Sequence, residues 1–266
     1  MVSIIDRLRG DNVPAPLGPA EPEPEEQFAE MTLQEHLEEL RSRLVRSALA
    51  VMVGSVVGLL LAWRIIHLMQ RLSNVKEFYA ITPTESFTSW MKVGLYFGIA
   101  LAMPVLIYQF VSFLAPGLTR KEKRVLYRFL PLIVLMFALG VAFAFFVVVP
   151  RALDWLAHFG NGTITSQLRP EEVISFYTTL ILWCGLVFET PVVMYVLAKL
   201  HIVTHQFLAH IRRYMLIVVM VAAAIITPTP DPFNQSLVAG PLFVLYFLGI
   251  LFAKIVQKPR PLVPEA

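Results

Sequence analysis

Charged residues are scarce in this sequence. Asp, Glu, Lys and Arg make up only 15% of the 266 residues, whereas a soluble domain usually carries about 25%. Apolar residues make up 57%, and the mean hydropathy is +0.67. The basic residues lie beside apolar blocks and lack the interleaved aromatic side chains of a nucleic-acid groove. We therefore expect a membrane protein that has lipid as its main solvent and no nucleic-acid partner.

Cysteine is almost absent, and the familiar enzyme motifs are missing. Cys184 is the only cysteine and lies inside an apolar block, which excludes a disulfide framework and a thiolate metal cluster. The sequence has no HExxH, no GxSxG and no glycine-rich phosphate loop, and its six histidines lack the spacing of membrane-embedded metal ligands. We therefore expect no enzyme activity, no metal and no cofactor.

The first 30 residues lack the apolar run of a cleavable signal peptide. Proline and glutamate dominate the stretch 10–27, a composition that cannot bury enough apolar surface to fold. We predict a disordered, acidic, proline-rich cytoplasmic tail over residues 1–30 and a second cytoplasmic tail over residues 254–266.

Six long apolar blocks lie between these tails, and most reach the roughly 20 residues that span a hydrocarbon core of about 30 Å. The fifth has 14 residues, or about 21 Å of helix, so it must thin the bilayer or re-enter it. The predicted fold is all-α: one polytopic membrane domain over residues 31–253, with six transmembrane helices of which the fifth and sixth are short. The predicted spans are 44–63, 88–114, 129–149, 176–200, 214–227 and 235–253.

The Lys and Arg residues between these spans predict the orientation. Fifteen lie on the side that holds both termini, against five on the opposite side. Because cytoplasmic segments carry the excess of positive charge, we expect both termini to be cytoplasmic and the chain to lie in the inner membrane of a bacterium.

Prolines interrupt four spans, and each removes a backbone donor and bends the preceding turn. A curved, concave bundle is the expected result. The alternative is that they are ordinary membrane-helix prolines whose freed carbonyls are satisfied by neighbours. They are Pro104, Pro131, Pro191 and Pro241.

An amphipathic helix is predicted ahead of the first span, because four leucines recur on one helical face. It carries Glu39 close to the lipid interface, four residues before Arg43. Glu122 lies among four basic residues between spans two and three. Each acid has a structural alternative: Glu39 pairs with Arg43 on its own helix, and Glu122 is a solvated loop charge paired with its neighbours. The leucines are Leu33, Leu37, Leu40 and Leu44.

Glu189 is an ionisable residue inside an apolar block, where burial is costly and a functional role is the default hypothesis. It lies about nine residues, or roughly 14 Å, from the cytoplasmic end of its span, near the midplane. The structural alternative is a protonated carboxyl bonded to a neighbouring helix or to a carbonyl freed near Pro191. A competing functional class is a secondary transporter or ion channel that uses Glu189 as its coupling site, although no internal repeat is visible. A structural scaffold would leave Glu189 unexplained.

Residues 36–44, HLEELRSRL, resemble the HLxELRxRL signature that opens members of the TatC family ahead of their first span. The similarity covers roughly residues 31–253, and its motifs occur in matching order. The further motifs are TPTESF at 82–87, Pro104, YQF at 108–110, FLAPGL at 113–118, Glu122, FETP at 188–191, and TPTPDP at 227–232 with Gln235.

The resemblance implies a cupped six-span receptor that binds the twin-arginine signal peptides of folded proteins and recruits the single-span subunits TatA and TatB, with the proton gradient as energy source. Glu39 and Glu122 match the family's acids that contact the paired arginines, and Glu189 matches its intramembrane acid. Asp231 and Gln235 match positions near the last helices. We further expect contact with membrane lipid and assembly of several copies within the receptor complex.

Overall fold

The structure is a computed structural model that describes residues 33–73, 78–159, 169–227 and 231–257. Every regular element in these ranges is helical, and most are α-helices. Residues 115–117 form a short 3-10 helix, and residues 144–148 form a π-helix between α3 and α4. The α-helices are α1 (Leu33–Leu72), α2 (Pro83–Leu114), α3 (Arg120–Phe143), α4 (Val149–His158), α5 (Pro170–Phe188), α6 (Thr190–Lys199), α7 (His205–His210), α8 (Arg212–Ile226) and α9 (Pro232–Val256).

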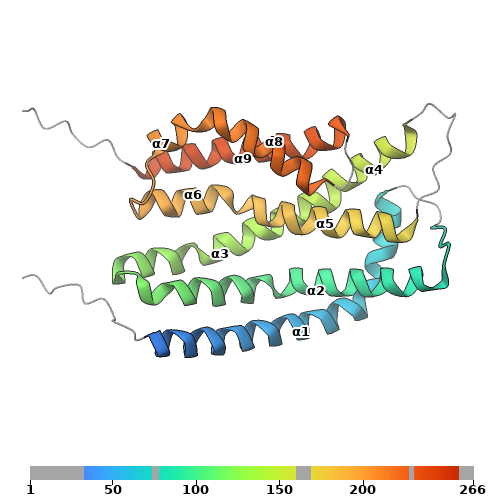
Figure 1. Cartoon of the computed structure of the whole chain (residues 1–266), viewed down its shortest axis with the longest axis horizontal. Coiled ribbons are helices and arrows are strands. Elements are labelled where there is room, and N and C mark those ends of the chain that lie inside the picture. The colour runs from blue at the N-terminus through green and yellow to red at the C-terminus, as the bar shows by residue number, and fades with distance from the viewer. Residues whose placement is uncertain (1–32, 74–77, 160–168, 228–230, 258–266) are drawn as a thin grey trace, which may run out of the picture.

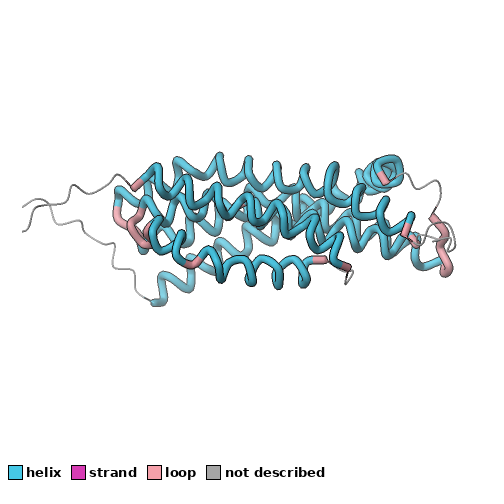
Figure 2. The backbone as a smooth tube through the Cα atoms, turned by 90° about the horizontal axis from the view of Figure 1, so that it is seen from above, coloured by secondary structure: helices cyan, strands magenta, loops and turns pink. Residues whose placement is uncertain are grey.

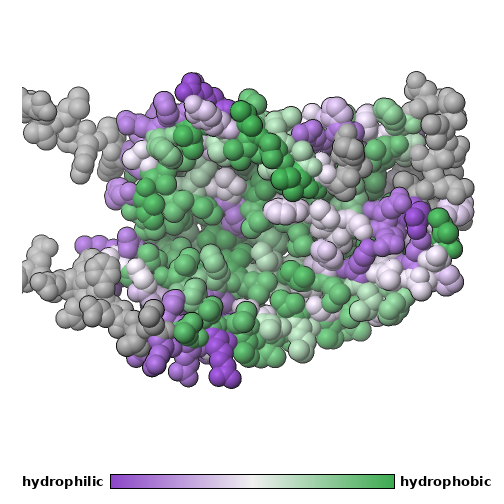
Figure 3. Space-filling view, viewed as in Figure 1, coloured by the Kyte–Doolittle hydropathy of each residue, from purple (hydrophilic) through white to green (hydrophobic). Residues whose placement is uncertain are grey.

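The chain passes six times along one long bundle (Figures 1 and 2). α1, the α3–α4 unit and α8 run in one direction, and α2, the α5–α6 unit and α9 run back. Both ends of the described chain therefore lie at the same end of the bundle, which we call the terminal end; the other is the far end. Hydrophilic residues gather at both ends and apolar residues cover the middle (Figure 3). The arrangement confirms the all-α, polytopic membrane fold.

Five helical segments in the described ranges are long and apolar enough to cross a membrane. α8 has only 15 residues, about 22 Å of helix, so the short fifth span is confirmed. α9 has 25 residues and is the shortest of the other five, yet it is long enough to span. The shortness predicted for the sixth helix therefore holds only relative to its neighbours.

Several elements extend beyond the predicted spans. α1 contains both the amphipathic segment and the first span in a single helix of 40 residues. Leu37, Leu40 and Leu44 lie on its exposed side, as expected of a face directed at lipid. The predicted tail over residues 1–30 and most of the tail over 254–266 lie outside the described residues.

α1 and α2 form the most intimate helix pair of the bundle because glycines face one another across it. A Cβ atom built on Gly54 would lie 2.4 Å from the Gly98 carbonyl oxygen, and one on Gly58 would lie 2.1 Å from the Gly94 carbonyl oxygen. Both distances are far below van der Waals contact, so only glycine permits this approach, as in small-xxx-small membrane contacts. The pair holds the start of α1 against the end of α2.

The α5–α6 unit is the centre of the bundle. Half of its apolar window is buried, compared with 22% for α1, and Tyr177, Ile174 and Leu180 of α5 are fully buried. Beside it, α1, α2 and α3 enclose an apolar pocket of about 450 Å³ whose lining includes Phe97 and Pro104. This hollow is the concave side that the prolines predicted.

Candidate functional site

Glu39 lies near the start of α1, at the terminal end, and its carboxylate is paired with Arg43 one helical turn later. The Arg43 Nε donates to Glu39 Oε1 at 2.9 Å, and Nη2 contacts the same oxygen. The two side chains are only 17% and 20% exposed. The predicted intrahelical pair is therefore present. The second oxygen, Glu39 Oε2, is buried and has no hydrogen-bond partner among the described residues.

Arg43 also reaches the neighbouring helix. Its Nη1 donates to Gln109 Oε1 on α2 at 3.4 Å, and Gln109 is buried. One turn towards the end of α2, Phe113 stacks on His36 of α1 with ring centroids 4.6 Å apart. These contacts align the first turns of α1 with the last turns of α2.

Glu122 begins α3 at the same end of the bundle, where it forms a capping box with Thr119. Glu122 Oε2 accepts from the Thr119 backbone N–H at 2.9 Å, and Thr119 Oγ1 accepts from the Glu122 N–H at 3.4 Å. The carboxylate is therefore fixed by backbone at a helix N-terminus, where a negative charge is favourable. The α1 pocket beside Glu39, about 380 Å³ in volume, is lined by α1 residues alone: Glu35, Glu38, Glu39, Ser42, Arg43 and Arg46.

Glu189 is the single residue between α5 and α6. It caps both helices and is 8% exposed. Neither carboxyl oxygen has a hydrogen-bond partner of ordinary geometry in the described chain. The bonds to a neighbouring helix or freed carbonyl that the structural alternative requires are therefore not made, and the carboxyl group is a buried polar group with spare capacity.

Asp231 and Gln235 fix the joint between α8 and α9. Asp231 caps α9 by accepting from the Asn234 backbone N–H at 2.8 Å, and Gln235 Nε2 donates to the Met220 carbonyl of α8 at 3.0 Å. The parallel helices α6 and α9 touch where a Cβ on Gly249 would meet Met194. Counted from that contact, Gln235 lies about nine residues, or 14 Å, farther along the bundle than Glu189. The structure does not gather these residues into one cluster.

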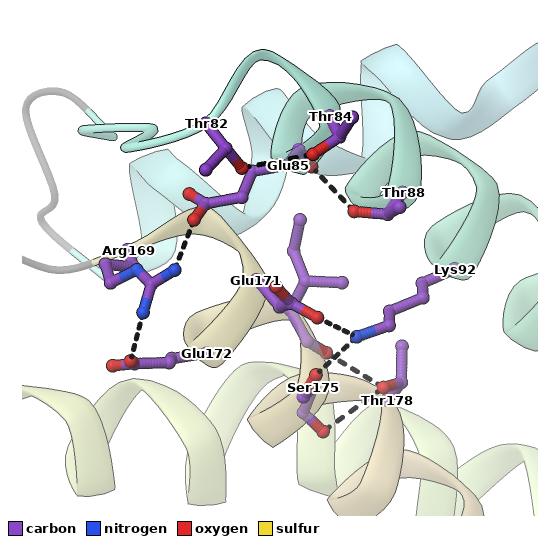
Figure 4. Close-up of polar contacts among 11 residues, drawn as sticks. Thr82, Thr84, Glu85, Thr88, Lys92, Arg169, Glu171, Glu172, Ser175 and Thr178 are labelled. Atoms are coloured by element: carbon purple, nitrogen blue, oxygen red, sulfur yellow. Dashed lines mark hydrogen bonds and ion pairs between the residues drawn. The ribbon is translucent and has the colours of Figure 1, made fainter.

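A charged network at the far end joins α2 to the start of α5 (Figure 4). Lys92 Nζ donates to Glu171 Oε1 at 2.8 Å and to Ser175 Oγ at 3.3 Å. Arg169 lies between Glu85, whose carboxylate it contacts, and Glu172 at 3.5 Å. Its hydrogen bond with the Glu85 carboxylate raises the pKa of the Arg169 guanidinium.

Sequence reasoning missed this network. Its signal was Lys92, a lone cation inside the apolar block 88–114, which requires an anionic partner. Glu171 lies 79 residues away in the chain, and no local pattern identifies it.

The fold and the polar residues define a class: a multi-pass helical membrane protein with carboxylates at its terminal end and one isolated acid at a helix break. Residues 35–241 match the model of the family described as Sec-independent protein translocase protein (TatC). The chain belongs to the TatC family.

Individual relatives agree with the family match over nearly the whole chain. The chain is 39% identical over 232 residues to the TatC protein of Carboxydothermus hydrogenoformans, covering 86% of this chain and 95% of that one. It is 36% identical over 245 residues to the TatC protein of Aquifex aeolicus, covering 89% and 100%. A crystal structure of the twin arginine translocase receptor TatC superposes with a TM-score of 0.73 at 35% identity, covering 84% of this chain and 100% of that chain.

Proposed function

We propose that this chain is the receptor and core subunit of a twin-arginine protein translocase, which binds the signal peptides of folded proteins for export. The family match supports this role over most of the chain. The observation that carries the site is Glu39, whose buried, unpartnered Oε2 lies beside the α1 pocket. The terminal end then faces the cytoplasm of a bacterium, in agreement with the basic residues gathered there.

In this proposal Glu39 and Glu122 each receive one guanidinium of the signal. A planar guanidinium binds a carboxylate through two parallel hydrogen bonds, which an ammonium cannot form. The apolar pocket between α1, α2 and α3 is suited to the hydrophobic part of the signal. The basic residues around Glu122 are suited to anionic lipid headgroups.

We assign Glu189, Asp231 and Gln235 to contacts with the single-span partners TatA and TatB. Glu189 offers two unpartnered oxygens inside the membrane domain, and Gln235 lies where the short α8 brings the far surface close to α9. Several copies assemble within the receptor complex. The transporter or channel alternative has no support in the family match.

Binding of a labelled twin-arginine peptide to the protein in nanodiscs tests the site. Glu39→Ala and Glu122→Ala are each expected to weaken binding about tenfold or more, because a charge-assisted hydrogen bond is worth about 1.5 to 3 kcal/mol. Glu38→Ala is the matched control, since this exposed acid lines the same pocket one residue away. A peptide with paired lysines is expected to bind more weakly to the wild type, and the difference to shrink in both variants. An unchanged arginine-to-lysine affinity ratio in both variants would remove the direct contact.

A further inference from the structure

The Glu39 carboxylate already holds a guanidinium, and that guanidinium belongs to its own chain. Arg43 offers the same chemical group that a twin-arginine signal presents, and it binds the same side chain. Because both side chains are largely buried, water screens this pair less than an exposed i,i+4 pair. A ligand arginine can reach Glu39 fully only by changing this contact.

The internal contact uses half of the carboxylate. Both donating nitrogens of Arg43 converge on Oε1, and Oε2 is left buried without a partner among the described residues. A guanidinium that approaches head-on uses both oxygens. Arg43 rises from the same helix one turn away, and here it engages only one. An external arginine therefore has a bonding geometry available that the internal one does not use.

Arg43 also has a second acceptor within reach. Its Nη1 already donates to Gln109 Oε1 across the α1–α2 contact, at a long 3.4 Å. If Arg43 left Glu39, this bond could shorten and keep the displaced guanidinium hydrogen-bonded. Gln109 is buried at the inner side of the pair, so the displaced charge would still lie near a polar partner.

We propose that Arg43 is an internal stand-in for the signal arginine, and that Gln109 receives it when the signal binds. This inference rests on the proposed function, namely on Glu39 as the acceptor of a signal guanidinium. Arg43 keeps the buried carboxylate paired and oriented, and it competes with every incoming peptide. The measured dissociation constant is then larger than the intrinsic one by the inverse of the fraction of receptors in which Glu39 is free.

The two residues of this device have opposite expected effects. Arg43→Gln removes the competitor, so a twin-arginine peptide is expected to bind about three- to tenfold more tightly. Gln109→Leu removes the second acceptor at similar volume, so the displaced guanidinium is left unpaired and the same peptide is expected to bind at least about threefold more weakly. A purely structural clamp predicts the same sign for both, because either change breaks the one α1–α2 contact.

The measurement is equilibrium binding of a fluorescent twin-arginine peptide to the full-length protein in nanodiscs, with thermal unfolding of each variant as a check of folding. Arg46→Gln is the matched control: it removes one exposed positive charge from the same pocket, so it measures the general electrostatic gain. Arg43→Lys is the second variant should Arg43→Gln fold poorly. It keeps the charge but loses the fork, and it is expected to tighten binding to a smaller extent.

Glu39→Gln separates this inference from the proposed function. If Glu39→Gln leaves binding unchanged, the proposed signal site is wrong and the inference falls with it. If Glu39→Gln weakens binding, the gain from Arg43→Gln should disappear when the two changes are combined. A gain no larger than that of Arg46→Gln, or weaker binding for both Arg43→Gln and Gln109→Leu, would overturn the stand-in role alone.

Discussion

Replacing Gly58 by alanine should separate α1 from α2. The new Cβ would lie 2.1 Å from the Gly94 carbonyl oxygen, about 1.3 Å short of the 3.4 Å at which ordinary contact begins. The neighbouring atom is backbone, so no side-chain rotation relieves the clash and the helices must move apart. Overpacking of this kind typically costs about 1 to 3 kcal/mol, and the facing contacts of Gly54 and Gly98 would weaken with it.

Gly240→Ala is the matched control, because its Cβ would meet nothing within 4 Å. Alanine is the better helix former by about 0.5 to 1 kcal/mol, so this change should leave stability unchanged or raise it. Reversible unfolding in mixed micelles measures both variants, and peptide binding shows whether the site at the start of α1 moves. The close-packing argument is refuted if Gly58→Ala unfolds within about 0.5 kcal/mol of the wild type.

Three further predictions concern other parts of the chain. Glu189→Ala should reduce transport more than peptide binding, because this carboxyl lies away from the terminal end, and wild-type transport by both Glu189→Ala and Glu189→Gln would contradict its role. Lys92→Met should lower the free energy of unfolding by less than about 1 kcal/mol, since Lys92 and Glu171 are 35% and 43% exposed; the exchange Lys92→Glu with Glu171→Lys should recover most of the loss. In a Cys184→Ala background, the exposed Ser236→Cys should react with an impermeant thiol reagent from outside the cell, and reaction only from the cytoplasm would reverse the proposed orientation.

Much of the fold could be predicted from sequence because membrane insertion is decided by local hydropathy. Each span is recognised by its own residues, without reference to a partner. The short fifth helix was predicted at 14 residues and has 15. The Glu39–Arg43 pair was equally local, since i,i+4 neighbours meet on any helix. The family resemblance rested on ordered local motifs and was confirmed by the family match.

The tertiary structure alone decided which residues meet across the bundle. Gly58 faces Gly94, Lys92 binds Glu171, and Arg43 reaches Gln109 across 66 residues of sequence. It also decided that Glu189 has no hydrogen-bond partner in the described chain. Hydropathy and periodicity give the face and depth of each residue but not which helix lies opposite. That choice depends on the packing of whole helix surfaces, in which close backbone approach and buried polar pairs outweigh the nearly uniform attraction between apolar side chains and lipid.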